Sequence, residues 1–321
     1  MRLSNLLKNE NNTTSKKQVN KNKKINLLIL LAMSFLSFSL LFSSCTTSKA
    51  PAGDSSSQSI TANSDSQSNE ATGLEKLTGN LEIIGSTSTQ VLVETFADEF
   101  TSKNSDVKIN YQGVGSSKGI KAVKDTTADI GTSSRELKEE EKSWGLAEYT
   151  MAKDGIAISV HPDNKITELT TEQIIKIFTG VITNWKDVGG DDSKIIVSSR
   201  EAGSGTRGAF EELLGIEDKV IKEALIYDGN GPVKASIASN KAAIGYLSFG
   251  YLDNSIKALK VDEVEPNIDN MLSGKYPLQR PFIMVTNGDA EGLVKSFIEY
   301  VTSNEGQQIV KNEGYIPIVN K

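Results

Sequence analysis

The stretch SREAGSGTRGAF, residues 199–210, decides the fold because it marks a strand that turns directly into a helix. The apolar run KIIV (194–197) precedes it, and the helix-compatible run TRGAFEELL (206–214) follows its glycines. Arg200 stands at the start of the junction, and small or hydroxyl residues fill the rest of it. Such a junction is typical of a phosphate-binding loop at a helix N-terminus, or of a nucleophilic serine.

Strand-like and helix-like segments alternate along the chain from residue 81 onward. LEII (81–84) has the length and composition of a buried strand, and QVLVETFADEF (90–100) has apolar residues at helical spacing. Thr170 and Gln173 form a capping-box pattern ahead of a third apolar run, and Gly180 suits that helix's end. This alternation predicts an α/β fold with largely parallel sheets.

Four predicted strands end in loops of glycine, serine and threonine. These loops are GSTST after Ile84, GVGSSKG after Tyr111, GTSSRE after Ile130 and SREAGSGT after Val197. In parallel α/β sheets, ligands bind beyond the carboxyl ends of the strands, near helix N-termini. Small residues let backbone N–H groups approach a ligand, hydroxyls add donors, and helix dipoles add positive potential. The four loops together predict a site for a small oxyanion.

Catalytic machinery is not evident in the sequence. A nucleophilic Ser204 needs a general base, but the single histidine, His161, stands in a predicted turn after a strand. GSGTRG lacks the Gly-Lys-Ser/Thr of a nucleotide-binding loop, and the sequence has no Cys/His cluster. The acidic run KEEEK (138–142) is predicted to be a solvated helix face. We therefore expect no enzymatic activity, no cofactor and no metal.

The N-terminal part of the chain has the pattern of an export signal. A basic segment (1–24) precedes an uncharged apolar run (25–44), and Cys45, the single cysteine, follows at once. FSSC (42–45) resembles a bacterial lipobox, so residues 1–44 are predicted to be a lipoprotein signal peptide and Cys45 the lipidated residue. The alternative is an uncleaved anchor, since 20 apolar residues can span a bilayer. Both place the rest of the chain outside the cytoplasm, attached to the cell membrane.

The composition after the signal sets two further limits. Residues 45–78 are rich in serine and poor in apolar residues, which predicts a disordered tether. The whole chain has a formal net charge of −6. Seven basic residues and one acid precede Cys45, so the remainder carries a net charge of −12. Such a negative balance argues against a nucleic-acid partner.

Six stretches carry a resemblance to a known family. They are GSTS (85–88), NYQGVGSSKGI (110–120), ADIGTSSREL (128–137), IFTGVITNW (177–185), REAGSGTRGAF (200–210) and YPLQRPF (276–282). In this order and spacing the chain resembles the phosphate-binding lipoproteins of high-affinity phosphate ABC importers. The resemblance implies a two-lobed periplasmic-binding-protein fold of type II, with each lobe a mostly parallel sheet flanked by helices.

The resemblance also implies a domain division and partners. Lobe I would comprise residues 79–154 and 281–321, and lobe II residues 155–280, with chain crossings near Lys153–Ile156 and Pro277–Ile283. The ligand would be inorganic phosphate in the cleft between the lobes. The partners would be an ABC permease with its ATPase, and the protein would act as a monomer, in a monoderm bacterium.

The family's ligand residues carry over to matching positions of this sequence. The resemblance implies that lobe I binds the anion through hydroxyls and helix N-termini, and that lobe II adds an arginine and a third helix N-terminus. The implied phosphate-binding residues are Thr87, Ser88, Ser116, Ser134, Arg200, Ser204, Gly205 and Thr206. For each serine alone, helix capping is an alternative, and for Arg200 the alternative is a surface salt bridge with Glu201.

One position departs from the best-known branch of the family. There an aspartate follows the strand that matches ADIGTS and accepts the proton of hydrogen phosphate, which sulfate lacks. Here Ser134 takes that place, and Arg135 follows it. Arg135 either adds charge to the site or pairs with an acid such as Glu201. Other functions left open are a receptor for sulfate or another oxyanion, a surface phosphohydrolase, and a phosphate sensor or adhesin without a transporter.

Overall fold

The computed structural model describes residues 76–318, which belong to one compact unit, Ala71–Lys321. The predicted signal peptide 1–44 with Cys45 lies outside the described residues, and so does the predicted tether up to residue 75. Among residues 76–318, no helix is both long and apolar enough to cross a membrane. Regular structure begins at Gly79, two residues before the first strand predicted from the sequence.

One group of strands and helices surrounds a first hydrophobic core. Its strands β1, β2 and β3 are parallel, and β11 pairs antiparallel with β3. The strands are β1 (Gly79–Gly85), β2 (Val107–Gly113), β3 (Ile130–Ser133) and β11 (Gln279–Asn287). The helices are α2 (Gln90–Lys103), α3 (Ser116–Lys124), α4 (Glu139–Lys142), α9 (Gly292–Thr302) and α10 (Asn304–Asn312).

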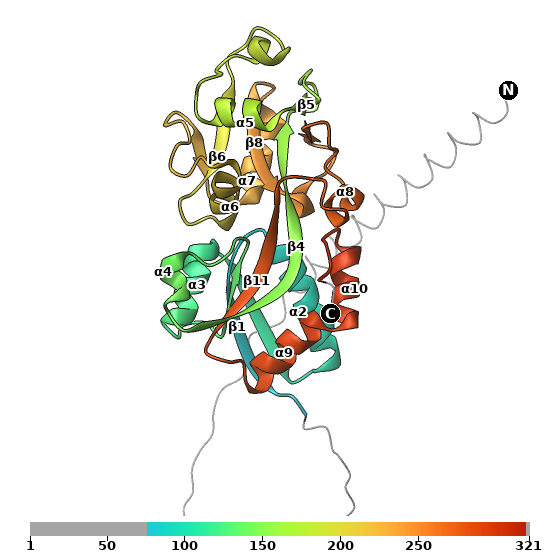
Figure 1. Cartoon of the computed structure of the whole chain (residues 1–321). Coiled ribbons are helices and arrows are strands. Elements are labelled where there is room, and N and C mark those ends of the chain that lie inside the picture. The colour runs from blue at the N-terminus through green and yellow to red at the C-terminus, as the bar shows by residue number, and fades with distance from the viewer. Residues whose placement is uncertain (1–75, 319–321) are drawn as a thin grey trace, which may run out of the picture. The chain divides into compact units, whose positions relative to one another are not determined.

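Amphipathic helices close this first core. The buried residues of α2 recur at helical spacing, and Phe96 and Phe100 pack toward the sheet. Phe100 meets Phe297 of α9 edge to face, with ring centroids 5.4 Å apart. Because α9 and α10 come from the C-terminal end of the chain, this core joins segments about 200 residues apart in sequence, as the blue-green and red ribbons of Figure 1 show.

A second group of elements surrounds a separate core. Here β8 pairs parallel with β6, and β6 pairs parallel with β7. The strands are β5 (Glu168–Leu169), β6 (Ile196–Arg200), β7 (Leu225–Tyr227), β8 (Ala243–Ser248), β9 (Lys257–Ala258) and β10 (Lys260–Val261). The helices are α5 (Thr171–Phe178), α6 (Gly205–Leu214), α7 (Asn230–Ser239), α8 (Ile268–Leu272) and the short 3-10 turns η1 (Trp185–Val188) and η2 (Phe249–Tyr251).

Three aromatic rings lie at the centre of the second core. Phe210 of α6 stacks on Tyr246 of β8 with centroids 4.0 Å apart, and Phe178 of α5 packs against both rings.

The capping box and the terminal glycine that the sequence predicts for α5 are both confirmed. Thr170 accepts a hydrogen bond from Gln173 N–H in a capping box, and Gly180 has a φ of +78° just beyond the helix. A positive φ favours glycine at this position.

Strand β4 (Leu146–Val160) joins the two groups. From Leu146 to Gly155 it pairs antiparallel with β11, and from Ile156 to Val160 it pairs antiparallel with β8. The sheet therefore runs without a break in the order β2-β1-β3-β11-β4-β8-β6-β7. In Figure 1, β4 and β11 extend side by side from one lobe into the other. The α/β prediction is confirmed, and the parallel strands of each lobe are linked by this antiparallel pair.

Candidate functional site

The predicted loops meet where the carboxyl ends of β1, β3 and β6 face the first turns of α3 and α6. Thr87 lies 3.2 Å from the Arg200 guanidinium, and the Ser88 and Thr206 hydroxyl oxygens are 2.7 Å apart. These contacts join residues 113 and 118 positions apart in sequence. The structure thus brings together the residues predicted from both lobes: Thr87, Ser88, Ser116, Ser134, Arg200, Ser204, Gly205 and Thr206.

Arg200 ends strand β6 and is 1% exposed. Its Nη2 donates to the Thr87 hydroxyl, and its Nη1 lies 3.4 Å from Thr206 Oγ1. Its Nε and Nη2 also donate to the two carboxylate oxygens of Glu201, each at 2.9 Å. The ion pair with Glu201 is therefore present, although Arg200 is buried rather than on the surface. The Glu201 carboxylate balances the charge and fixes the guanidinium plane, because a bidentate pair has a defined geometry.

The N-terminus of α6 faces the same place. The Ser204 hydroxyl accepts a hydrogen bond from Arg207 N–H at 3.2 Å, so Ser204 is the N-cap of the helix. The N–H groups of a helix's first turn have no partner within the helix. Gly205 and Thr206 therefore present N–H groups at the positive end of the helix dipole, where anions are favoured.

Ser116, Ser134 and Gly205 lie close together where the lobes meet. Ser134 N–H donates to Ser116 Oγ at 3.1 Å, and Ser86 Oγ donates to Ser134 Oγ at 2.8 Å. A Cβ atom on Gly205 would lie only 2.1 Å from Ser116 Oγ and 2.6 Å from Ser134 Oγ. Glycine is required at this position for the lobes to come this close.

Arg135 forms a buried ion pair with Glu141 of α4. Its Nη1 and Nη2 each donate to one carboxylate oxygen of Glu141 at 2.7 Å, and Nη2 also donates to Ser117 Oγ. Both side chains are almost fully buried. The prediction that KEEEK (138–142) is a solvated face is therefore wrong at Glu141, because the guanidinium of Arg135 compensates its burial. The acid that pairs with Arg135 is Glu141 rather than Glu201.

Further side chains reach the cluster, among them Asn230 and Arg280, which the sequence reading missed. Asn230, the first residue of α7, is fully buried and donates through Nδ2 to Ser88 Oγ at 2.9 Å and to Thr87 Oγ1 at 3.3 Å. Arg280 of β11 donates through Nη2 to Ser88 Oγ at 3.1 Å.

A glycine signal for the Asn230 loop exists in the sequence. Gly229, the N-cap of α7, has a φ of +102°, and Gly115, the N-cap of α3, has a φ of +104°. The segment DGNGP (228–232) is thus a fifth loop of the same kind as the four that were predicted.

Arg280 is paired with Asp154, which stands directly opposite it on β4. Arg280 Nε and Nη2 donate to Asp154 Oδ2 at 3.0 and 2.7 Å, and both side chains are buried. Burial raises the pKa of Asp154 and lowers the pKa of Arg280, and the attraction between the two charges opposes both shifts. Each of the two arginines at the site is therefore paired with its own carboxylate.

Comparison with known proteins identifies the family of the chain. Residues 57–305 match the model of the PBP superfamily domain. The chain is 38% identical over 259 residues to the phosphate-binding protein PstS of Bacillus subtilis, covering 79% of this chain and 86% of that one. It is 33% identical over 252 residues to the PstS of Borreliella burgdorferi, covering 74% and 90%. The chain belongs to the PstS-type phosphate-binding proteins.

Solved structures of similar proteins have the same fold. A Clostridium perfringens protein whose structure contains bound phosphate is 44% identical, with a TM-score of 0.73, and covers 75% of this chain and 100% of its own. An ABC-type phosphate transport receptor from Vibrio cholerae is 38% identical, with a TM-score of 0.65, and covers 74% and 100%. The predicted two-lobed PBP-like fold is confirmed.

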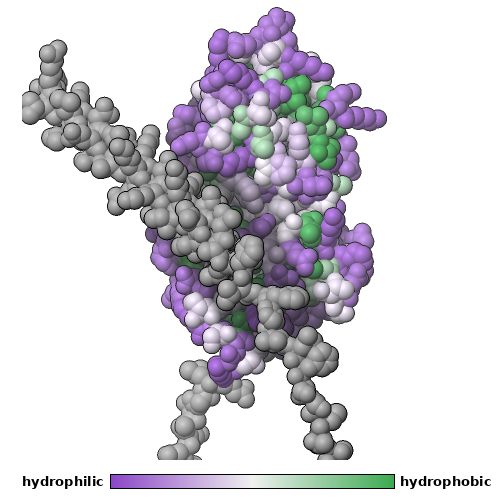
Figure 2. All heavy atoms as spheres, turned by 180° about the vertical axis from the view of Figure 1, so that it is seen from behind, coloured by the Kyte–Doolittle hydropathy of each residue, from purple (hydrophilic) through white to green (hydrophobic). Residues whose placement is uncertain are grey.

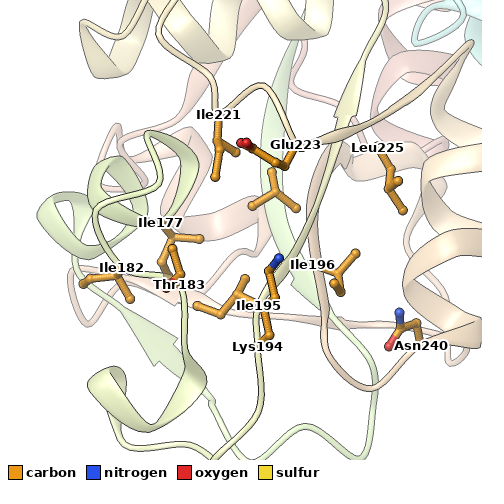
Figure 3. Close-up of a pocket in the computed structure, with 11 residues that line it drawn as sticks. Ile177, Ile182, Thr183, Lys194, Ile195, Ile196, Ile221, Glu223, Leu225 and Asn240 are labelled. Carbon is orange, nitrogen blue, oxygen red and sulfur yellow. The ribbon is translucent and has the colours of Figure 1, made fainter.

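A separate cavity of about 590 Å³ lies at the amino end of β6, away from Arg200. Figure 3 shows its lining of isoleucines and Leu225, with Lys194 and Glu223 as its charged groups. Apolar surface also gathers on the lobe that contains this cavity in Figure 2. Because PBP-type ligands bind at carboxyl strand ends, and because this lining has few donors, the cavity is not part of the oxyanion cluster.

Within residues 76–318, no group of three or more potential ligand residues could hold a metal ion.

Proposed function

We propose that this protein captures inorganic phosphate outside the cytoplasm and delivers it to an ABC permease. Thr87, Ser88, Ser116 and Ser134 would bind from lobe I. Arg200 would bind from lobe II, together with Ser204, Gly205 and Thr206 at the N-terminus of α6. The relatives named PstS and the phosphate-bound Clostridium perfringens structure support the choice of phosphate.

One observation carries the proposal. Arg200, almost fully buried, donates to hydroxyls on both sides of the cleft, Thr87 from lobe I and Thr206 from lobe II. Its charge, the hydroxyls and the first turn of α6 converge on one buried place. Oxyanions are held in this way by directed donors in a region of low dielectric constant.

The path of β4 and β11 supports a division into lobes. We propose that lobe I comprises residues 79–154 and 281–321 and lobe II residues 155–280, so that both crossings lie where β4 changes partner from β11 to β8. Phosphate would favour the closed arrangement by the difference between its affinities for the closed and open forms. The closed form would then be the one that the permease recognises.

Attachment to the membrane completes the proposal. Lipid on Cys45 would hold the protein, as a monomer, at the outer face of the cell membrane, and residues 46–78 would serve as the tether. Mass spectrometry of the membrane fraction tests this part, because a diacylglycerol adduct on Cys45 should disappear in Cys45→Ser. An unmodified Cys45 in the mature protein would refute it.

Ser204 supports binding rather than hydrolysis. Its hydroxyl oxygen caps α6 by accepting from Arg207 N–H, and a general base would have to remove its proton before attack. The alternative activity has a direct test in the turnover of a chromogenic phosphoester. Turnover that is lost in Ser204→Ala would overturn the proposal of a non-enzymatic binding protein.

Isothermal titration with phosphate tests the binding role. Arg200→Ala removes charge-assisted hydrogen bonds and should lower the affinity by about 2 kcal/mol or more, which corresponds to about thirtyfold. Lys241→Ala, which removes an exposed cation of the same lobe, is the matched control and should bind as the wild type does. Equal affinities of Arg200→Ala and the wild type would remove Arg200 from the site. Sulfate as a competitor tests the alternative anion.

A further inference from the structure

The buried ion pair of Asp154 and Arg280 lies where the chain passes between the two lobes. Strand β4 pairs with β11 as far as Gly155 and with β8 from Ile156 onward, and Asp154 stands directly opposite Arg280 in the β4–β11 pair. Both side chains are at most 1% exposed. Hinges are formed by a few residues at such junctions, which take up the change in backbone angles when domains close. The pair therefore lies at the proposed hinge.

The guanidinium of Arg280 connects this place to the anion cluster. Its Nε and Nη2 donate to Asp154 Oδ2 at 3.0 and 2.7 Å, and Nη2 also donates to Ser88 Oγ at 3.1 Å. The N–H groups of a guanidinium lie in one plane, in a fixed fork. Because the contacts with Asp154 fix that plane, they also fix the direction from which Nη2 meets the Ser88 hydroxyl.

Ser88 in turn contacts the opposite lobe. Its hydroxyl oxygen lies 2.7 Å from Thr206 Oγ1 of α6 and accepts from Asn230 Nδ2 of α7 at 2.9 Å. Ser88 is fully buried, so a rotation of its side chain would leave these polar groups without bulk water as a substitute partner. The orientation of one hydroxyl thus decides three hydrogen bonds, of which one involves the hinge and two involve lobe II.

We propose that Asp154 and Arg280 are positioning residues for phosphate binding, which hold the Ser88 hydroxyl toward lobe II and so link the anion cluster to the strands that join the lobes. The inference rests on the proposed function. Neither residue needs to touch the anion, because Asp154 acts through Arg280 and Arg280 acts through Ser88. Without the pair, Ser88 has more rotational freedom in the free protein, and ordering it when the lobes close lowers the affinity.

A double-mutant cycle measured by titration calorimetry with phosphate tests the proposal. Loss of one partner would leave a buried charge unpaired, so Asp154→Asn and Arg280→Met are combined in one pair variant that removes both charges. The pair variant should lower the affinity for phosphate by about tenfold or more when Ser88 is present. In the Ser88→Ala background the same change should lower it less than about threefold, because the contact that transmits the effect is already gone.

Ser116→Ala is the matched control background. Ser116 is also a buried hydroxyl of lobe I in the anion cluster, and its side chain accepts from Ser134 N–H rather than from Arg280. The pair variant should therefore lower the affinity in this background by the same factor as in the wild type. Urea unfolding without phosphate provides a second cycle that does not depend on a ligand. There Ser88→Ala should lower the unfolding midpoint more in the wild type than in the pair variant.

Each outcome has a defined meaning. Equal losses of affinity with Ser88 and with Ser88→Ala would show that the pair acts in another way, and an unchanged affinity of the pair variant would equally overturn the inference. A wild type that binds no phosphate would refute the proposed function, and the urea cycle would then decide the positioning role, with equal midpoint losses as the result against it. If the pair variant does not fold, Arg280→Lys carries both cycles, because it keeps the charge beside Asp154 but lacks the fork that reaches Ser88 as well.

Discussion

Replacing Gly205 by alanine tests how closely the two lobes approach each other at the first turn of α6. The added methyl carbon would lie 2.1 Å from Ser116 Oγ, 2.6 Å from Ser134 Oγ and 3.0 Å from Ser116 Cβ. Both serines belong to the opposite lobe, so the clash exists only while the lobes are together. Overpacking of this kind typically costs about 1–3 kcal/mol. Phosphate affinity should therefore fall by about fivefold to 150-fold.

The stability of the ligand-free protein separates this effect from misfolding. Because the clash is relieved when the lobes part, Gly205→Ala should unfold at the same denaturant concentration as the wild type or slightly above it, since alanine restricts the unfolded chain. Gly231→Ala in the first turn of α7 is the control, because a Cβ there meets no atom within 4 Å. Titration calorimetry and urea unfolding measure the two quantities. Phosphate affinity within twofold of the wild type would refute the argument.

Three further predictions concern stability away from the anion cluster. Glu141→Gln should cost about 3–5 kcal/mol of unfolding free energy in urea, because it leaves the buried charge of Arg135 uncompensated; a loss below 1 kcal/mol would contradict the assignment of this pair. Burial raises the pKa of Glu141, but hydrogen bonds from Arg135 and from Lys138 N–H outweigh it, so the net shift is downward. The pair's contribution should therefore be complete above pH of about 4.5 and be lost as the pH falls through the lowered pKa, so that the stability gap between wild type and Glu141→Gln narrows in acid. Thr170→Ala should cost about 1 kcal/mol by removing the N-cap of α5, measured by thermal unfolding, with phosphate affinity unchanged as the check on its local effect.

The parts of the site that the sequence predicts follow local rules. Ser204 and Gly205 could be located because a strand, a small-residue loop and a helix follow one another within 20 residues, and such junctions place N–H groups at a sheet's carboxyl edge. Arg200 lies in the same junction, and the family resemblance implies its role as the charged contact. These inferences need no knowledge of the tertiary contacts.

The residues that the sequence reading missed depend on distant partners. Asn230 follows β7, a strand of only three residues, and the partners that bring it to the site, Thr87 and Ser88, lie 143 and 142 residues away in sequence. Arg280 and Asp154 are 126 residues apart, and nothing local to either indicates their pairing. The sequence predicts an exposed Glu141 because its neighbours are charged. Glu141 is buried in the structure because the guanidinium of Arg135 pairs with both of its carboxylate oxygens.

The position of β11 between β3 and β4 also determines the order in which the lobes can form. As the chain is synthesised from its N-terminus, β4 can pair with β8 once residue 248 is available, and β9 joins β4 at residues 257–258. The other half of β4, from Leu146 to Gly155, can pair only when residues 279–287 of β11 have been synthesised. Helices α9 and α10, which cover the core of lobe I, are synthesised later still. An incomplete lobe I then exposes unpaired strand edges, which invite aggregation. During synthesis and export, lobe I therefore needs protection until almost the whole chain has emerged.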